Sequence, residues 1–377
     1  MDTTTAGWTA PPGLEGVVVA ETRIGSVRGE EGFYHYGPHP APALAERCTT
    51  EEVWHLLHRG HLPDSDELDR FAATTGRLRA LPDDVASALG PIAAIGGSQS
   101  LAGPRTALSL LAAAEGFGPW LDLSSDVIHH QALRLVAVLP TLTASLWRLG
   151  QGEDPIAPTP DRPLAEDYLR MVTGSEPLPQ HVRALERYLV LTIDHGFNAS
   201  TFTARTVTST GADLGSAVVA AMGALSGPLH GGAPSLALDM LQQIGRPDRA
   251  AAWVDEALAG GRRIMGFGHR VYRTEDPRSA LLKQTAIELG GPIVDLAIEV
   301  EGTILEALQR HRPGRELRTN VEYYAGVVLH LVGLPEELFT PTFAISRNIG
   351  WTAHAIEQME ANRLIRPRAR YVGPPPD

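Results

Sequence analysis

A histidine on a glycine-rich turn is the first candidate for chemistry in this chain. The stretch SGPLHGGAP, residues 226–234, places His230 between a Gly-Pro pair and two glycines. Pro228 fixes its own φ, while Gly231 and Gly232 accept strained torsions and allow a ligand to approach closely. Such a turn aims a versatile acid or base in one definite direction. On these residues alone, a helix-capping turn that happens to contain a histidine is an equal alternative.

Further polar side chains in the second half of the chain extend this pattern. His195 stands near Asn198 in DHGFNASTFTAR, and His269 follows a glycine turn in IMGFGHRVYR. Glu322 in TNVEYYAG lies beside an expected helix start at Asn320, where unpaired backbone amides and the helix dipole favour a carboxylate. Each residue taken singly is also compatible with an ordinary surface or core position.

Several arginines follow the same histidines and carboxylate along the chain. Arg278 closes the DPR triplet, and Arg366 and Arg368 lie in LIRPRARYVG. Arg347 falls within an otherwise apolar helix, FAISRNIGW, where a charge is unfavourable unless it has an anionic partner. Guanidinium groups match carboxylates in geometry and stay charged. Histidines on rigid turns, one carboxylate and several arginines together suit carbon–carbon chemistry on a polyanion.

Two other motifs are weaker indications. HLLHRGH contains His55, His58 and His61 at the spacing of a metal site, but Gly60 is expected to end the helix before the third histidine. The carboxylate of the zinc-protease pattern is missing, so we interpret these residues as solvated or core histidines and predict no metal site. GFGH, residues 266–269, begins like a dinucleotide fingerprint but lacks its third glycine, so we predict no cofactor.

Composition narrows the classes of protein to which the chain can belong. Its 377 residues suggest about two domains, and a hydrophobic content of 43% supports a sizeable core. A net charge of −12 argues against nucleic acid and anionic membranes as partners. The single cysteine, Cys48, excludes an intrachain disulfide. The start lacks the pattern of a secretory signal, and the apolar stretches 132–147 and 216–225 are shorter than a membrane span, so we expect a cytoplasmic protein.

The sequence predicts a mostly helical architecture that positions these residues. The best strand candidate is 14–37, where β-branched runs alternate with glycines. Thr49 or Thr50 is expected to cap a helix that stops at Gly60. No strands alternate with helices, which argues against a doubly wound sheet. Apolar residues recur at helical spacing in three further segments, 183–193, 234–244 and 295–308.

With these motifs in place, the chain resembles the citrate synthase family over nearly its whole length. The blocks GPLHGGA and GFGHRVY followed by DPR are the most specific, and the match is densest over 194–371. The resemblance implies a mainly α, two-domain fold with a short β region near the N-terminus. The expected large domain comprises 1–227 and 336–377, and the expected small domain comprises 228–335. It also implies a homodimer and a site in the cleft between the domains.

The resemblance assigns a role to each candidate residue. Glu322 would remove a proton from the methyl group of acetyl-CoA, while His230 donates a hydrogen bond to the thioester oxygen. His269 would bind the keto oxygen of oxaloacetate and protonate the alkoxide. CoA enters as a thioester co-substrate, with no metal or redox cofactor. The expected oxaloacetate ligands are His195, Arg278, Arg347 and Arg366, the last entering from the other subunit.

Departures from the family pattern leave the acyl donor open. Most of the family has aspartate where NVEYYAG has Glu322, and a misplacement of about 1 Å can lower a rate on the order of a hundredfold. We expect the backbone to compensate, and the alternatives are a slow enzyme or a different acyl donor. HGFN also differs from relatives with Glu and Gln after the histidine.

A pocket distinguishes one methylene by only ~1–3 kcal/mol, so propionyl-CoA, giving 2-methylcitrate, is the alternative donor. A non-catalytic relative that binds CoA or a tricarboxylate is the other alternative. Arg270 and Arg273 are candidates for CoA contacts.

Overall fold

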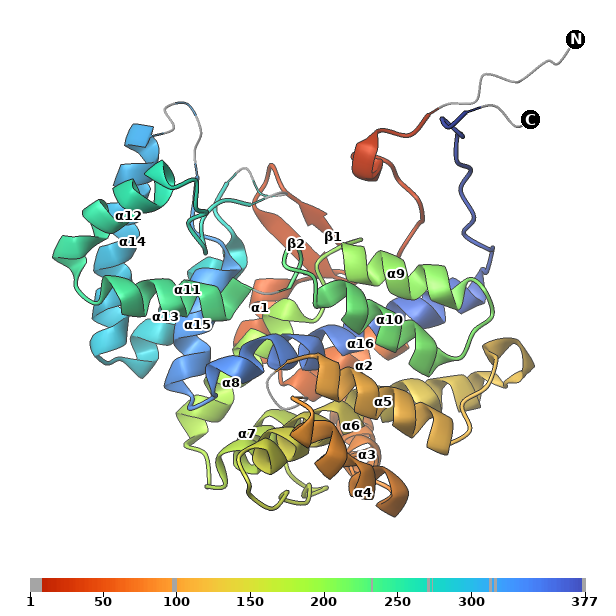
Figure 1. Ribbon diagram of the computed structural model, residues 1–377. Coiled ribbons are helices and arrows are strands. Elements are labelled where there is room, and N and C mark those ends of the chain that lie inside the picture. The colour runs from red at the N-terminus through yellow and green to blue at the C-terminus, as the bar shows by residue number, and fades with distance from the viewer. Residues whose placement is uncertain are drawn as a thin grey trace, which may run out of the picture.

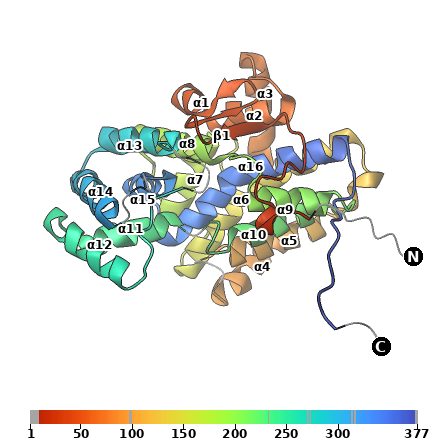
Figure 2. The same ribbon diagram turned by 90° about the horizontal axis from the view of Figure 1, so that it is seen from above.

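The structure is a computed structural model that describes residues 9–96, 100–231, 233–269, 272, 274–311, 314 and 317–374. Helices make up most of it, as the sequence predicted (Figures 1 and 2). The helices are α1 (Ala41–Arg47), α2 (Thr50–Arg59), α3 (Ser65–Arg77), α4 (Asp83–Ala94), α5 (Ala102–Ala114), α6 (Ser125–Gly150), α7 (Leu164–Thr173), α8 (Pro179–Thr192), α9 (Ala199–Thr208), α10 (Leu214–Leu225), α11 (Ala233–Ile244), α12 (Ala250–Ala259), α13 (Pro277–Leu289), α14 (Pro292–His311), α15 (Val321–Leu331) and α16 (Phe339–Glu360).

A small antiparallel sheet forms the predicted β region near the N-terminus. Its strands are β1 (Gly25–Arg28), β2 (Phe33–Tyr36) and β3 (His39–Pro40), paired in the order β1-β2-β3. The hydroxyls of Tyr34 and Tyr36 donate to the carbonyls of Leu191 and Val190, at distances of 3.1 and 2.9 Å. The sheet is therefore anchored on the end of α8.

The strand prediction was wrong for the first part of 14–37. Pro12–Leu14 is a short 3-10 turn, and the β-branched run that follows is not part of a strand. Val18 is 87% exposed there. Within the described residues no neighbouring strand pairs with this run, and an unpaired β-branched segment cannot form a ladder.

Helix α16 is the central element of the fold. It packs against α2, α6, α8, α9, α10 and α11, and most of its residues are buried. At Gly350 a side chain would overlap the carbonyl oxygen of Ile193, so glycine allows α16 to lie directly against the chain that leaves α8.

Helices α11 to α15 gather on one side of the molecule (Figure 1). In this group α15 packs against α11 and α13, and α12 packs against α14. The group meets the rest of the fold where α8 contacts α13 and α15, and where α11 contacts α16. All five helices lie within 228–335, the range predicted for a small domain, although the buried apolar residues form one continuous cluster.

Local sequence signals define the helix ends as expected. Thr49 caps α2 in a reciprocal capping box with Glu52, and Gly60 ends that helix with a left-handed φ of 85°. Asn320 caps α15 by accepting from the backbone N–H of Glu322. Gly245 follows α11 with φ of 65°.

Helix α6 is long and apolar enough to cross a membrane by composition. However, 83% of its apolar window is buried within the fold. A helix that is apolar on all sides and enclosed by other helices is a core element.

We predict that Gly350→Ala destabilises the protein, because the new methyl group would overlap the Ile193 carbonyl in a packed core. Overpacking of this kind costs about 1–3 kcal/mol. The matched control is Gly302→Ala in α14, where a Cβ would meet no atom within 4 Å. That change should leave stability unaltered or raise it by up to about 1 kcal/mol through helix propensity. Urea unfolding midpoints measure both effects, and equal midpoints for the two variants would contradict the prediction.

Candidate active site

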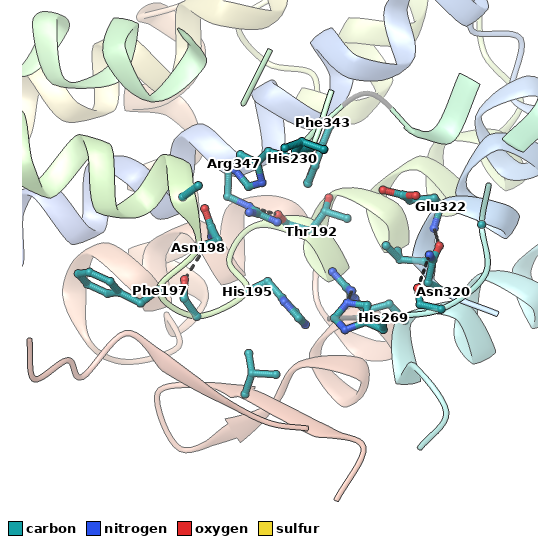
Figure 3. A pocket seen from close by; sticks show the side chains of 18 of the residues that line it. Thr192, His195, Phe197, Asn198, His230, His269, Asn320, Glu322, Phe343 and Arg347 are labelled. Carbon is teal, nitrogen blue, oxygen red and sulfur yellow. Dashed lines mark hydrogen bonds between the residues drawn. The ribbon is translucent and has the colours of Figure 1, made fainter. Parts of the chain in front are cut away.

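One large cleft brings together six of the seven residues predicted for the site. Its volume is about 1500 Å³, and its walls come from the N-terminal segment, the loop after α8, the turn after α10 and the first turns of α13 and α15. The predicted residues that line the cleft are His195, His230, His269, Arg278, Glu322 and Arg347. Figure 3 labels all of these except Arg278 around the cavity.

The hydrogen bonds of His230 determine its tautomer. The backbone N–H of Ser200 donates to Nε2 of His230 at 3.2 Å, and the Ser200 hydroxyl lies 2.8 Å from the same nitrogen. Because a backbone N–H only donates, Nε2 is an acceptor and the ring proton is on Nδ1. Trp351 donates to the Ser200 hydroxyl at 3.0 Å and fixes its place. Burial, helped by the charge of Arg347, lowers the pKa of His230 to about 4, so the ring is neutral at pH 7.

The turn that carries His230 depends on a close approach to the end of α10. The His230 N–H donates to the Gly227 carbonyl at 2.9 Å. A Cβ on Gly231 would overlap the Leu225 carbonyl oxygen. Glycine is therefore required here for contact with the chain's own backbone, and Gly232 lies outside the described residues.

Donors face both ring nitrogens of His269. The Tyr272 N–H donates to its Nδ1 at 2.9 Å, and Nη2 of Arg278, which can only donate, lies 3.2 Å from its Nε2. These two contacts therefore do not fix the tautomer of the neutral ring. Burial, with the charge of Arg278, lowers the pKa of His269 to about 4. The Arg278 fork beside this ring suits an oxygen atom with negative charge.

Asp276 connects Arg278 to the start of α15. This carboxylate is 1% exposed. Its Oδ1 accepts from the backbone N–H and Nε of Arg278, at 3.1 and 3.0 Å. Its Oδ2 accepts from Nη2 of Arg278 at 2.8 Å and from the Val321 N–H at 3.0 Å. Sequence reasoning missed Asp276, although an aspartate directly before a proline is a typical helix N-cap.

Glu322 occupies the first turn of α15. Its backbone N–H donates to Asn320 Oδ1 at 3.0 Å, and Asn320 Nδ2 donates to the Gly268 carbonyl at 2.8 Å. The cap of α15 therefore also holds the turn that carries His269. No described residue donates a hydrogen bond to the Glu322 carboxylate. Burial raises its pKa to about 7, although Arg278 opposes that shift.

Arg347 presents its guanidinium to the cleft from the middle of α16. The residue is 2% exposed, its Nε donates to the Thr192 carbonyl at 2.8 Å, and the guanidinium lies 4.6 Å from the Phe343 ring centre. Among the described residues no carboxylate lies within 4.0 Å of it. The anionic partner that we expected for Arg347 from the sequence therefore does not form a direct ion pair with it within the described residues.

His195 lies between the two arginine-bearing walls. Its Nε2 is 2.9 Å from the Tyr272 hydroxyl, and its ring contacts that of Tyr34. Burial and the charges of Arg278 and Arg347 hold the pKa of His195 well below its usual range. The predicted residues in the cleft thus combine neutral histidines, two guanidinium groups and one carboxylate, a set suited to a substrate that carries carboxylates.

Arg366 is the predicted site residue that the structure places elsewhere. It is exposed in the C-terminal segment and does not line the cleft of its own chain. This segment leaves the body beside the N-terminal segment, where Arg370 donates to Thr9 at 3.0 Å (Figures 1 and 2). Arg270 and Arg273, the candidates for CoA contacts, lie outside the described residues.

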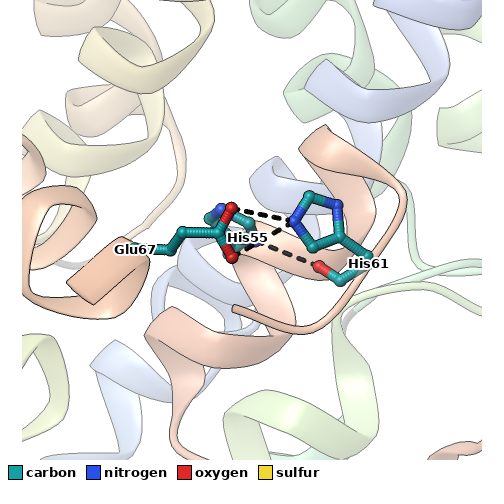
Figure 4. Close-up of side chains that lie close together, drawn as sticks. All are labelled: His55, His61 and Glu67. Atoms are coloured by element: carbon teal, nitrogen blue, oxygen red, sulfur yellow. Dashed lines mark hydrogen bonds and ion pairs between the residues drawn. The ribbon is translucent and has the colours of Figure 1, made fainter. Parts of the chain in front are cut away.

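The three histidines of HLLHRGH do not contribute to the cleft. His58 is a core residue with Nε2 3.1 Å from the Thr352 hydroxyl, and burial lowers its pKa to about 3. His55, His61 and Glu67 lie close together between α2 and α3, with ligand atoms within 4.8 Å of one another (Figure 4). His61 Nε2 is 3.2 Å from Glu67 and His55 Nδ1 is 3.0 Å from the His61 carbonyl, so hydrogen bonds link the three residues.

Comparisons with known proteins point to one family. The family described as citrate synthase, C-terminal domain, matches residues 13–368. The citrate synthase of Haloferax volcanii is 38% identical over 96% of this chain and 95% of its own. The 2-methylcitrate synthase 2 of Corynebacterium glutamicum is 36% identical over 96% and 94%. The ternary complex of citrate synthase from Thermoplasma acidophilum with carboxymethyl coenzyme A and oxaloacetate superposes with a TM-score of 0.88, at 31% identity over 97% and 96%.

We predict that the Glu322 carboxyl titrates near pH 7, because burial disfavours its charged form. It should be protonated well below that pH and ionised above it. Infrared difference spectra between about pH 5 and about pH 9 would detect the carboxylate band, since unperturbed glutamates near pKa ~4.3 ionise mostly below that range. Glu322→Gln should remove one band.

Glu186 in α8 provides the matched control for this titration. Burial also raises its pKa to about 7, so Glu186→Gln should remove a second band and leave that of Glu322. An unchanged spectrum for Glu322→Gln would contradict the prediction.

Proposed function

The chain belongs to the citrate synthase family, and we propose that its own cleft residues perform that family's condensation. The reaction is an acyl transfer in which acetyl-CoA and oxaloacetate give citrate and free CoA. The observation that carries the assignment of residues is the pairing of one carboxylate of raised pKa with two histidines of lowered pKa around a single cavity.

Oxaloacetate would bind between the two arginine-bearing walls. Arg278 and Arg347 offer planar forks that match its two carboxylates. His195, held by Tyr272, supplies a further polar contact. Because Arg278 and Arg347 each bring a guanidinium group to one of these walls, the bound dianion meets favourable charge on both sides.

Proton removal from the thioester would use Glu322 and His230 together. The methyl group of a thioester is a very weak acid, so a base needs a partner that stabilises the charge on the thioester oxygen. Glu322 takes the proton, and the Nδ1–H of His230 donates to that oxygen. His230 is effective because Ser200 already holds its ring, so little reorganisation is needed during reaction.

Carbon–carbon bond formation would then use His269. In the tautomer with its proton on Nε2, the His269 ring polarises the keto carbonyl of oxaloacetate, the methylene carbon attacks that carbonyl, and the new alkoxide takes up that proton. Arg278, 3.2 Å from Nε2, offsets the charge left on the ring. Water then cleaves the thioester of the citryl-CoA intermediate, which releases the CoA thiol and leaves a carboxylate.

Glutamate can serve as the base here because its backbone is held from two sides. Asn320 caps the first turn of α15, and Asp276 accepts from the Val321 N–H. These contacts support the proposal that the start of α15 is placed to accommodate the extra methylene of Glu322.

The assembly proposed for this enzyme is a homodimer. Arg366 lies on an exposed segment outside the cleft of its own chain, which supports a place in the site of a second subunit.

We further propose that α11 to α15 move as the small domain, 228–335, and close over oxaloacetate, which would exclude water until condensation is complete. We propose a soluble, cytoplasmic location.

Acetyl-CoA is the proposed donor, and the similarity to a 2-methylcitrate synthase makes propionyl-CoA the alternative. Purified protein with oxaloacetate should release free CoA thiol faster from acetyl-CoA than from propionyl-CoA. A preference for propionyl-CoA would change the assignment to 2-methylcitrate. No release from either donor would favour a non-catalytic binding protein.

Substitutions at position 322 test the base in the same thiol assay. Glu322→Gln should lower kcat by about 100- to 10,000-fold, the usual contribution of a general base. Glu322→Asp keeps the charge but withdraws the oxygens by about 1 Å, and should lower kcat on the order of a hundredfold. An aspartate variant as fast as the parent enzyme would show that the backbone is not adapted to glutamate.

Mixing two inactive variants tests whether Arg366 acts across subunits. In a heterodimer of Arg366→Gln and His230→Ala chains, one site would combine an intact His230 with an intact Arg366 from the other chain. An equal mixture of refolded chains should therefore recover about a quarter of the parent activity, since about half the dimers are mixed and each has one intact site. If Arg366 serves its own chain, the mixture stays inactive.

A further inference from the structure

A buried chain of polar groups lies behind the wall of the cleft. Asp194, His354 and Arg205 are 1%, 1% and 3% exposed, and none of them is among the residues assigned above. His354 Nε2 is 3.2 Å from Asp194 Oδ1, and Arg205 Nη1 is 3.0 Å from His354 Nδ1. Arg205, on α9, also donates to Glu357 at 2.6 Å and to Gln358 at 3.1 Å. These two residues lie on α16 and hold the Arg205 side chain against that helix.

The direction of these hydrogen bonds follows from Arg205. A guanidinium has no acceptor, so Arg205 donates to Nδ1 of His354. The neutral ring therefore carries its proton on Nε2 and donates it to Asp194. Phe197, which lines the cleft, packs against both donors: its ring centre is 6.1 Å from that of His354 and 5.4 Å from the Arg205 guanidinium.

Both oxygens of Asp194 are occupied in this arrangement. Oδ1 accepts from His354, and Oδ2 accepts from the Gly196 N–H at 3.1 Å. Burial opposes ionisation, but His354 and Arg347 outweigh it and hold the pKa of Asp194 below its usual range. The carboxylate is therefore an anion at the base of the loop that carries His195.

Arg347 is a cation whose charge acts on this anion. Asp194 is the negative charge that most favours the charged form of Arg347. Nevertheless, within the described residues no carboxylate lies within 4.0 Å of the guanidinium, whose one hydrogen bond runs from Nε to the Thr192 carbonyl. The terminal nitrogens are left for a ligand in the cleft.

We propose that His354 is a positioning residue that holds Asp194 away from Arg347 and so keeps the guanidinium open for a carboxylate of the substrate. If the Nε2–H is lost, Oδ1 of Asp194 is buried without a donor, and a buried carboxylate without a donor is strongly unfavourable. Arg347 is the available replacement donor. An Asp194–Arg347 ion pair would then compete with the dicarboxylate for the same fork. This inference rests on the proposed binding of oxaloacetate.

Two variants of His354 separate the hydrogen bond from the volume of the ring. His354→Phe keeps an aromatic ring against Phe197 but has no donor. The KM for oxaloacetate should rise about tenfold or more, the scale of a lost hydrogen bond to a charged group, while the KM for acyl-CoA and kcat change little. His354→Gln returns an N–H donor near the position of Nε2 and should recover most of the affinity for oxaloacetate.

A surface substitution of the same type serves as the control. His330 is exposed in the last turn of α15, and His330→Phe should leave all three constants unchanged. A rise in both KM values with a fall in kcat for His354→Phe, without recovery in His354→Gln, would indicate a general packing defect and overturn the proposal.

The variant Asp194→Asn tests whether His354 affects Arg347 through Asp194. Asparagine keeps the size of the side chain but removes the charge that competes for Arg347. In that background His354→Phe should no longer raise the KM for oxaloacetate, so the two changes are strongly non-additive. Additive effects would overturn the proposed competition.

If the parent enzyme does not consume oxaloacetate, the proposed function itself is wrong, and this outcome is distinct from a failure of the His354 proposal. Titration calorimetry with oxaloacetate alone gives the binding constants of the same variants without turnover. An active parent enzyme whose affinity for oxaloacetate is the same in His354→Phe would overturn only the role of His354.

Discussion

The buried contact between Asp276 and Arg278 is the constraint on which the geometry of the cleft depends. One carboxylate holds the Arg278 fork on one side and the first free N–H of α15 on the other. A guanidinium buried to this degree needs a counter-ion, and a helix start needs an acceptor for its unpaired amides. Asp276 satisfies both requirements at once. It therefore fixes the distance between the arginine beside His269 and the helix that presents Glu322.

Burial shifts the pKa of the Glu322 carboxyl and the pKa values of the histidines in opposite directions. The same low-polarity walls that raise the pKa of Glu322 to about 7 lower those of His230 and His269 to about 4. Near neutral pH this leaves two uncharged rings that donate hydrogen bonds and a carboxylate that is ready to accept a proton. The Ser200 N–H selects Nδ1 as the donating nitrogen of His230. The tautomer and the pKa of this histidine are thus set by separate features of the fold.

Helix α16 supports the other half of the cleft through one of its faces. Arg347, Trp351 and His354 follow the spacing of one helical face and meet the chain that runs from Thr192 to Ser200. Gly350 on the same helix allows the two backbones to approach. One face of one helix therefore presents a cation to the ligand, fixes the serine behind His230 and holds the aspartate behind His195.

The sequence by itself determined the helical class, several helix ends and six of the cleft residues. Capping residues such as Thr49 and Asn320 act over three or four positions, and the periodic apolar faces are equally local, so both can be recognised without a structure. Only the tertiary structure decided which nitrogen of His230 carries the proton, that Asp276 joins Arg278 to the start of α15, that His354 contacts Asp194, and that 17–19 forms no strand. These properties depend on partners far away in the chain: Asp194 and His354, for example, are separated by 160 positions. Hydrogen bonds and burial act through space, and local sequence patterns do not contain the distances between such residues.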